Sequence, residues 1–144
     1  VCRSARAGAV TRGAFIDCPV LGIVNASNKA SPQLYRLAAR VLEQVPAARL
    51  RVIGVAGARA RNAALSHMPE PLHARVELVD RVAEAEYHRL VGGIDLALDP
   101  LVFSGATTTL DCLHAGLPVL TRPGRLPHTR SSLSILAQDR KSVV

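Results

Sequence analysis

The sequence predicts an α/β domain built on a doubly wound parallel sheet. Short runs of Val, Ile and Leu, typical of strands buried on both faces, recur along the 144 residues. Stretches with the helical spacing of apolar residues separate these runs, and a helix between two strands supplies the crossover that parallel pairing requires. Gly and Pro stand at the junctions. No segment repeats another, and the chain is long enough for one domain with a core of its own.

Residues 20–91 are expected to form three strands, each followed by a helix. Ser31 is a suitable N-cap and Pro32 fits the first helical position, where its missing N–H costs nothing, so a helix begins there and ends before Pro46. The pair Gly92-Gly93 ends the third helix. The expected strands are residues 20–24, 50–55 and 75–79, and the expected helices are residues 32–45, 58–68 and 83–91.

Residues 94–124 carry the strongest signal for function. An apolar strand at residues 94–98 leads into a turn around Gly105, and Thr107 then begins a helix that Gly116 closes. A helix that begins at the carboxyl end of a strand offers free N–H groups and the positive end of its dipole, and small side chains let a phosphate approach. We therefore expect a phosphate-bearing ligand, a nucleotide. The remaining expected elements are a helix at residues 107–115, a strand at residues 117–121 and a helix at residues 131–137.

Composition argues against several classes of protein. No apolar run approaches the roughly 20 residues needed to cross a bilayer, and the first residues lack the apolar centre of a signal peptide. We therefore expect a cytoplasmic protein that does not bind membranes. The three cysteines, Cys2, Cys18 and Cys112, form no Cys-x-x-Cys pair, which argues against a disulfide framework or a zinc site and favours inert thiols.

The net charge of +7 does not by itself indicate a nucleic-acid-binding protein. The arginines are scattered among Ala and Val instead of forming one basic run. Aromatic residues make up 3% of the chain and Trp is absent, so a platform for stacking bases is not expected. We expect no nucleic acid among the partners.

The two ends of the chain differ from the part between them. Residues 1–14 are expected to be an irregular lead-in, and the chain does not begin with Met. Residues 139–144 match the translation of a widely used sequencing adapter, so we expect them to be an artefact and exclude them from the fold. The domain is therefore expected at residues 15–138, as a piece of a longer enzyme.

Several motifs follow one another in a fixed order along most of the chain. Asn25, Lys29 and Pro32 precede a helix that ends in Val45-Pro46. The later motifs are Leu98-Asp99, Gly105, Thr107-Thr108, Asp111, Gly-Leu-Pro-Val at residues 116–119, Arg130 and Ser134. In order and spacing they resemble the motifs of the bacterial relatives of protein O-linked N-acetylglucosamine transferase, the tetratricopeptide-containing and SPINDLY-like family. The resemblance covers residues 15–136.

This resemblance implies a fold and an activity. Family members have the two-lobed GT-B glycosyltransferase fold, and the matched residues would form part of its Rossmann-like, carboxyl-terminal lobe. Such enzymes transfer N-acetylglucosamine, or a related sugar, from a uridine diphosphate (UDP) sugar to Ser or Thr hydroxyls of proteins, with no metal ion or other cofactor. The catalytic base belongs to the amino-terminal lobe, and tetratricopeptide repeats recognise the protein acceptor. Because the sequence contains neither part, the fragment alone is expected to be inactive.

The resemblance also implies which residues bind the substrate. They are Lys29, Tyr87, Gly105, Ala106, Thr107, Thr108 and Asp111. Thr107 and Thr108 would hold the diphosphate through hydroxyl and backbone N–H groups, and Lys29 would reach the same crevice as a cation. Asp111 would accept hydrogen bonds from the ribose, and Tyr87 would lie near the base. No catalytic residue and no metal ligand is assigned to this chain.

Each assignment has a structural alternative. Residues 107–109 are also suited to cap a helix, and Lys29 to be a solvated lysine. Asp111 is suited to stabilise a helix dipole, and Tyr87 to pack on the surface. Ala106 stands where the family often has His or Gly, which leaves the donor sugar open. The alternative functions are a related transferase that acts on Asn or on a non-protein acceptor, and a non-catalytic module for nucleotide binding or protein interaction.

Overall fold

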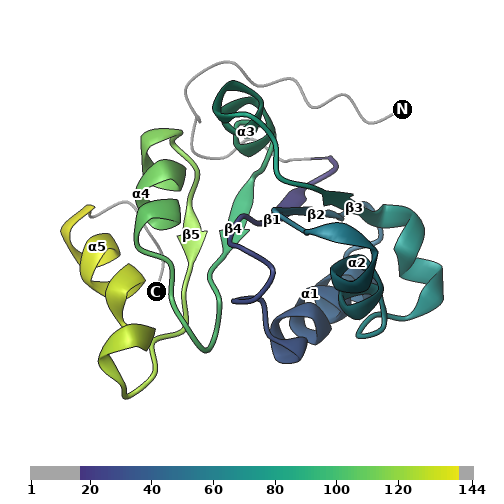
Figure 1. Ribbon diagram of the computed structural model, residues 1–144, viewed down its shortest axis with the longest axis horizontal. Helices are drawn as coiled ribbons and strands as arrows, with labels where there is room; N and C mark the ends of the chain where they lie inside the picture. The colour runs from purple at the N-terminus through teal and green to yellow at the C-terminus, as the bar shows by residue number, and fades with distance from the viewer. Residues whose placement is uncertain (1–16, 140–144) are drawn as a thin grey trace.

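The computed structural model describes residues 17–139 and contains one five-stranded sheet (Figure 1). All neighbouring strands are parallel, in the order β3-β2-β1-β4-β5. The strands are β1 (Val20–Ile23), β2 (Arg49–Ile53), β3 (Val76–Val79), β4 (Leu96–Leu98) and β5 (Val119–Leu120). The predicted Rossmann-like parallel sheet is therefore confirmed. The expected lead-in at residues 1–14 lies outside the described residues, as do residues 140–144 of the expected tail at 139–144. Asp139, the first residue of that tail, is the last residue of a helix.

The helices lie between the strands, as the sequence predicts. They are α1 (Pro32–Gln44), α2 (Gly57–Leu65), α3 (Glu84–Val91), α4 (Thr107–His114) and α5 (Ser131–Asp139), with two 3-10 helices, η1 (Glu70–Arg75) and η2 (Pro127–Thr129). The Oγ of Ser31 caps α1 by accepting a hydrogen bond from the N–H of Leu34 at 3.4 Å. At the other end of α1, the guanidinium of Arg75 donates to the carbonyls of Leu42 and Pro46, each at 2.8 Å. This contact satisfies carbonyls that a helix end leaves without partners.

Helices cover both faces of the sheet (Figure 1). One apolar cluster joins α1, α2 and η1 to one face, with Leu42 and Val52 fully buried in it. A second cluster joins α3, α4 and α5 to the other face, around Val91 and Cys112. Two clusters on opposite faces are the pattern of a doubly wound domain.

The chain reverses its direction of winding between β1 and β4. It passes from β1 outward to β3, and α3 then carries it back across the sheet to β4, which pairs with β1 at Leu21↔Leu96. The connections that follow β1 and β4 therefore leave the sheet on opposite sides. In open α/β sheets, ligands bind in the crevice at this point, outside the carboxyl ends of the strands.

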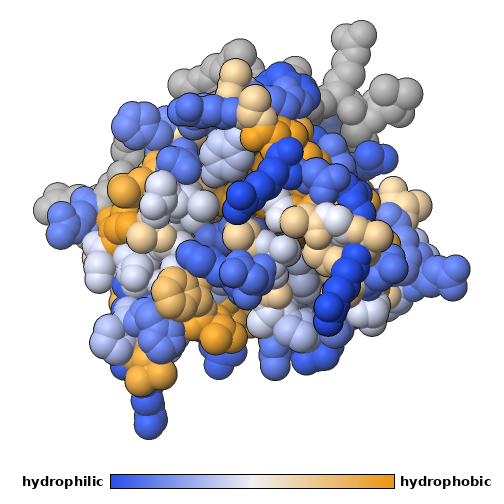
Figure 2. Space-filling view, in the orientation of Figure 1, coloured by the Kyte–Doolittle hydropathy of each residue, from blue (hydrophilic) through white to orange (hydrophobic). Residues whose placement is uncertain are grey.

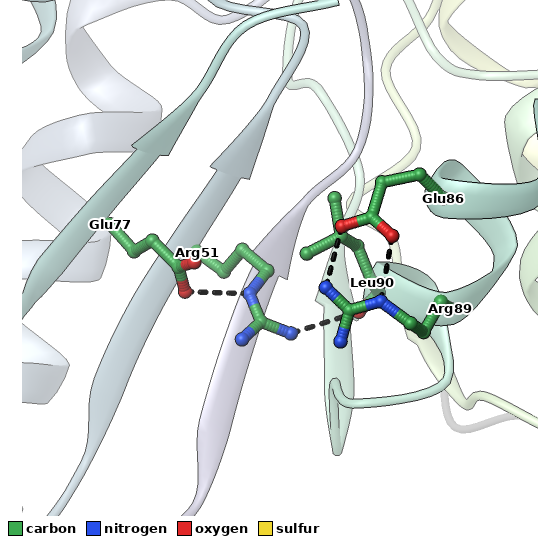
Figure 3. Close-up of polar contacts among 5 residues, drawn as sticks. All are labelled: Arg51, Glu77, Glu86, Arg89 and Leu90. Carbon is green, nitrogen blue, oxygen red and sulfur yellow. Dashed lines mark hydrogen bonds and ion pairs between the residues drawn. The ribbon is translucent and has the colours of Figure 1, made fainter. Parts of the chain in front are cut away.

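An arginine ties α3 to the outer strands (Figure 3). The guanidinium of Arg51, on β2, donates to a carboxylate oxygen of Glu77 on β3 at 2.7 Å and to the carbonyl of Leu90 on α3 at 2.9 Å. Figure 3 shows a second arginine, Arg89, which pairs with Glu86 on the exposed side of the same helix. Arg51 thus fixes the end of α3, the helix that connects β3 to β4 and so joins the two halves of the sheet.

Some sequence-based expectations need correction. β4 begins at Leu96 rather than at residue 94, and β5 is limited to Val119–Leu120. Cys112 is free, and burial is the main cause that raises the pKa of its thiol to about 12, which fits an inert thiol. Cys18 is disulfide-bonded, so the expectation of an inert thiol is wrong there. Among residues 17–139, no helix has the length and apolar character needed to cross a bilayer.

Candidate functional site

Two loops meet at the topological switch point, where the direction of winding reverses between β1 and β4. The first follows β1 and carries Asn25 and Lys29, and the second joins β4 to α4. The Nδ2 of Asn25, which is buried, donates to the Oγ1 of Thr108 at 2.6 Å. This hydrogen bond spans 83 positions in the sequence and fixes the amino-terminal end of α4 against the first loop.

A buried carboxylate organises the second loop. Asp99, directly after β4, accepts hydrogen bonds from the N–H of Gly105 at 2.8 Å and from the Oγ1 of Thr121 at 2.7 Å. Burial raises the pKa of the Asp99 carboxyl, although these hydrogen bonds and the charge of Lys29 act in the opposite direction. Asp99 therefore holds the turn at Gly105 and the end of β5 together, with Lys29 within electrostatic reach.

The carbonyl of Gly105 is held by two hydroxyl groups. The Oγ1 of Thr109 donates to it at 3.0 Å and the Oγ of Ser132 at 2.6 Å. Any side chain at position 105 would collide with its surroundings, because an added Cβ would lie 2.8 Å from the Nδ2 of Asn25 and closer still to the Oγ1 of Thr108. Glycine is therefore required where the two loops meet.

The start of α4 leaves backbone donors unused. Ala106 is the N-cap, and it has no side chain that could accept a hydrogen bond. Within residues 17–139, the N–H groups of Ala106, Thr107 and Thr108 have no hydrogen-bond acceptor. Among the described residues, no side chain caps α4, so the alternative in which residues 107–109 cap the helix is wrong. The side chain of Thr107 is exposed, the hydroxyl of Thr108 accepts a hydrogen bond from Asn25, and the hydroxyl of Thr109 donates one to the carbonyl of Gly105. Free donors beside small, exposed side chains suit an anion.

Lys29 is partly buried and lies over an aromatic ring. Its Nζ is 4.8 Å from the centre of the Phe103 ring, close enough for a cation–π interaction. Phe103 is half-exposed and stacks with His128 at 5.6 Å between ring centres. Phe103 is not among the site residues predicted from the sequence. Its only signal there was an aromatic residue two positions before the glycine of the loop.

Tyr87 and Asp111 form a separate pair beside these loops. The hydroxyl of Tyr87, on α3, donates to the Oδ2 of Asp111, on α4, at 3.3 Å. Burial, and after it the charge of Asp111, raises the pKa of the Tyr87 phenol. Because Asp111 follows Thr107 by one turn of α4, one helix connects this pair to the free donors at its start.

The predicted residues thus fall into two adjacent groups. Lys29, Gly105, Ala106, Thr107 and Thr108 lie in or beside the two loops, and Tyr87 and Asp111 form the pair between α3 and α4. Next to the loops, a hollow lies between α1 and the ends of β4 and β5, with Asp99, Thr121 and Arg122 in its lining. On the face seen in Figure 2, hydrophilic side chains predominate and hydrophobic ones form small separate patches.

Comparison with solved structures places this chain in a family. A variant of the O-GlcNAc transferase of Thermobaculum terrenum superposes with a TM-score of 0.76, at 31% sequence identity over 84% of this chain. The chain belongs to the O-GlcNAc transferase-like family. It is a fragment of the carboxyl-terminal lobe of this GT-B fold, as the resemblance of its sequence motifs implies. It spans 24% of the length of the Thermobaculum protein.

Two further structures share the fold of this O-GlcNAc transferase-like lobe. A putative UDP-N-acetylglucosamine 2-epimerase from Listeria monocytogenes superposes with a TM-score of 0.55, at 15% identity over 72% of this chain and 27% of its own. The S. aureus protein MnaA, in a co-structure with UDP, superposes with a TM-score of 0.64, at 13% identity over 89% of this chain and 33% of its own. No protein-family model and no curated protein sequence matches the chain.

Proposed function

We propose that this chain is the donor-binding lobe of a glycosyltransferase that binds a UDP-sugar. The observation that carries the proposal is the meeting of the β1 loop with the start of α4, where three backbone N–H groups find no acceptor in the described part of the chain. The family relationship and the S. aureus structure that contains UDP support the same ligand. In the complete enzyme, the sugar would be N-acetylglucosamine or a related hexose, and the acceptor a Ser or Thr hydroxyl of a cytoplasmic protein.

The leaving group of this reaction is a nucleoside diphosphate, and its negative charge must be stabilised as the sugar departs. The free N–H groups at the start of α4, the hydroxyl of Thr107 and the ammonium of Lys29 are suited to that task. Positive groups held before the reaction stabilise charge without reorganisation of the protein. We therefore expect the donor to bind without a metal ion or another cofactor.

The remaining contacts would fix the nucleoside. Asp111, one turn further along α4, would accept a hydrogen bond from the ribose, and Tyr87 would lie near the base. We assign no catalytic base to this chain, because its candidate residues surround the donor and not the acceptor. Catalysis by this lobe would consist of positioning the donor and stabilising the leaving group.

Titration of the full 144-residue chain with UDP tests the ligand. We expect binding in the wild type and a loss of roughly 10-fold or more in affinity for Lys29→Ala, since a hydrogen bond to a charged group contributes about that much. Arg49→Ala is the matched control, because it removes one exposed positive charge at the start of β2, at the opposite end of the sheet from the crevice. Equal affinities for wild type and Lys29→Ala would remove Lys29 from the site, and no binding of UDP would reject the proposed ligand.

The acceptor needs a separate experiment on the complete enzyme. Incubation with UDP-N-acetylglucosamine and peptides that carry either Ser and Thr or Asn as the only acceptors distinguishes the proposed activity from that of a related transferase. Mass spectrometry would detect one added hexosamine. Modification of the Ser and Thr peptides alone supports the proposal. UDP binding without transfer to any acceptor, or hydrolysis of the donor, would instead indicate a non-catalytic nucleotide-binding module.

A further inference from the structure

The Tyr87–Asp111 pair joins two helices at the candidate site. Tyr87 comes from α3 and Asp111 from α4, and the two side chains meet through a hydrogen bond to one carboxylate oxygen, Oδ2. Both residues are partly buried, so the contact lies at the edge of the protein and not in its core. No other hydrogen bond or ion pair to the Asp111 carboxylate exists among residues 17–139.

Packing fixes the donor of this hydrogen bond. The ring of Tyr87 rests against the apolar cluster around Val91 and Cys112 and lies edge-on to the ring of His88, with 5.4 Å between ring centres. A side chain that is packed in this way loses little freedom when its hydroxyl forms a hydrogen bond. An ordinary phenol is already protonated at neutral pH, and burial raises the pKa of Tyr87 further, so the hydroxyl remains a donor.

We propose that Tyr87 is a positioning residue, which holds the Asp111 carboxylate by Oδ2 and so directs Oδ1 toward one of the two ribose hydroxyls of the nucleotide. This inference rests on the proposed function and deepens it. An unrestrained carboxylate can turn and accept from both hydroxyls of a ribose. Each oxygen of a carboxylate can accept more than one hydrogen bond, but a carboxylate held in one orientation presents its other oxygen in one direction. The site should therefore distinguish between the two hydroxyls.

The experiment compares three ligands on the full chain: UDP, 2′-deoxy-UDP and 3′-deoxy-UDP, with dissociation constants from ligand-observed NMR titration. In the wild type, we expect one of the two deoxy analogues to bind about 10-fold more weakly than UDP, because a hydrogen bond to a charged group is lost. The other analogue should bind within about 2-fold of UDP. The ratio of the affinities for 2′-deoxy-UDP and 3′-deoxy-UDP therefore reports on whether the Asp111 carboxylate is held in position.

Four variants separate positioning from folding. Tyr87→Phe keeps the packed ring and removes the donor, and it should bring the affinities of the two deoxy analogues to within about 2-fold of each other. Asp111→Asn should also lose the discrimination between the two deoxy analogues. The double variant, with Tyr87→Phe and Asp111→Asn together, should behave as Asp111→Asn alone does. Tyr35→Phe is the matched control: Tyr35 is the only other tyrosine, and it lies on α1, buried in the apolar cluster on the opposite face of the sheet. It should leave all ratios unchanged.

The outcomes are distinguishable. A variant that only loosens the fold would weaken the three ligands equally and leave the ratio as in the wild type. An unchanged ratio in Tyr87→Phe, with UDP still bound, would therefore overturn the positioning role and leave the proposed function intact. Equal binding of both analogues by the wild type would do the same. Failure of the folded wild type to bind UDP would overturn the proposed function and this inference together.

Discussion

The two halves of the sheet are held together by different forces. Around β1, β2 and β3, one continuous apolar cluster joins the strands to α1 and α2. After β4, buried polar side chains are frequent instead. Of the seven buried polar residues within 17–139, all except Asn25 follow β4: Asp99, Ser104, Thr109, Thr121, Thr129 and Ser132. Asn25 itself reaches across to that half, where it binds Thr108.

Strand length explains part of this difference. β1 and β2 pair at four positions, whereas β4 and β5 pair only at Ala97↔Val119 and Leu98↔Leu120. A shorter ladder provides fewer backbone hydrogen bonds, and Asp99 and Ser104 add others between loops. The same hydrogen bonds shape the candidate site. Stability and ligand binding should therefore respond differently to substitutions in the two halves.

The largest expected effect is on stability alone. Leu42→Ala removes a fully buried side chain from the first half and should lower the free energy of unfolding by about 2–5 kcal/mol. The affinity of the folded protein for UDP should not change. Urea unfolding followed by circular dichroism measures the first quantity. Leu37→Ala on the same helix is the control, since Leu37 is 41% exposed and its truncation should cost far less. Equal costs for both variants would contradict the assigned core.

A substitution in the second half should affect stability and binding together. Gly105→Ala forces a methyl group against Asn25 and Thr108, at a cost of about 1–3 kcal/mol. Because these two residues join the β1 loop to α4, the affinity for UDP should fall as well. Gly92→Ala offers a comparison, since the nearest atom to its new Cβ would be 3.4 Å away. Unfolding and titration of both variants measure the two effects, and undiminished UDP affinity in Gly105→Ala would argue against the crevice.

The buried Asp99 should make stability depend on pH. Burial raises the pKa of this carboxyl in the folded protein above the ordinary value of 3.8, so the folded state binds the proton more tightly than the unfolded state. Stability should then fall as the pH rises from 3.8 through the raised pKa. Asp99→Asn removes this contribution. Free energies of unfolding for both proteins over this range should converge toward low pH, and curves that run parallel would contradict the direction of the shift.

The smallest effects are expected at the arginines of Figure 3. Arg51→Ala removes the hydrogen bond to the carbonyl of Leu90 and should lower the free energy of unfolding by about 1 kcal/mol. Arg89→Ala removes a solvent-exposed pair with Glu86, and the melting temperature should stay unchanged. Thermal unfolding of the two variants side by side tests this. A larger loss for Arg89→Ala would show that the exposed pair contributes more than the partly buried contact of Arg51 with Leu90.

Local signals allowed much of the fold to be predicted. Ser31 and Pro32 mark the start of α1, and Gly116, with a φ of 69°, ends α4 in the conformation that glycine favours. The 3-10 helix η1 was missed, because its prolines at positions 69 and 71 indicate only a break in regular structure. Local sequence thus predicts where a helix begins and ends, but it predicts the structure of short connections such as η1 less well.

The candidate site could be predicted only in outline. Topology alone brings the loops of Lys29 and Thr108 to the same crevice, because both follow strands at the switch point. The contacts between them depend on side chains that are far apart in the sequence. Neither the cation–π contact between Lys29 and Phe103 nor the hydrogen bond from Tyr87 to Asp111, 24 positions away, has a local signal. The roles assigned to these residues stay predictions until UDP binding is measured.

The two tyrosines have a spectroscopic consequence. The chain has no tryptophan, so its ultraviolet emission comes from Tyr35 and Tyr87 alone. Tyr35 stacks on His67 inside the first half, whereas Tyr87 touches the carboxylate of Asp111 in the second. With Tyr35 replaced by Phe, the remaining fluorophore is an unlabelled, intrinsic sensor at the candidate site.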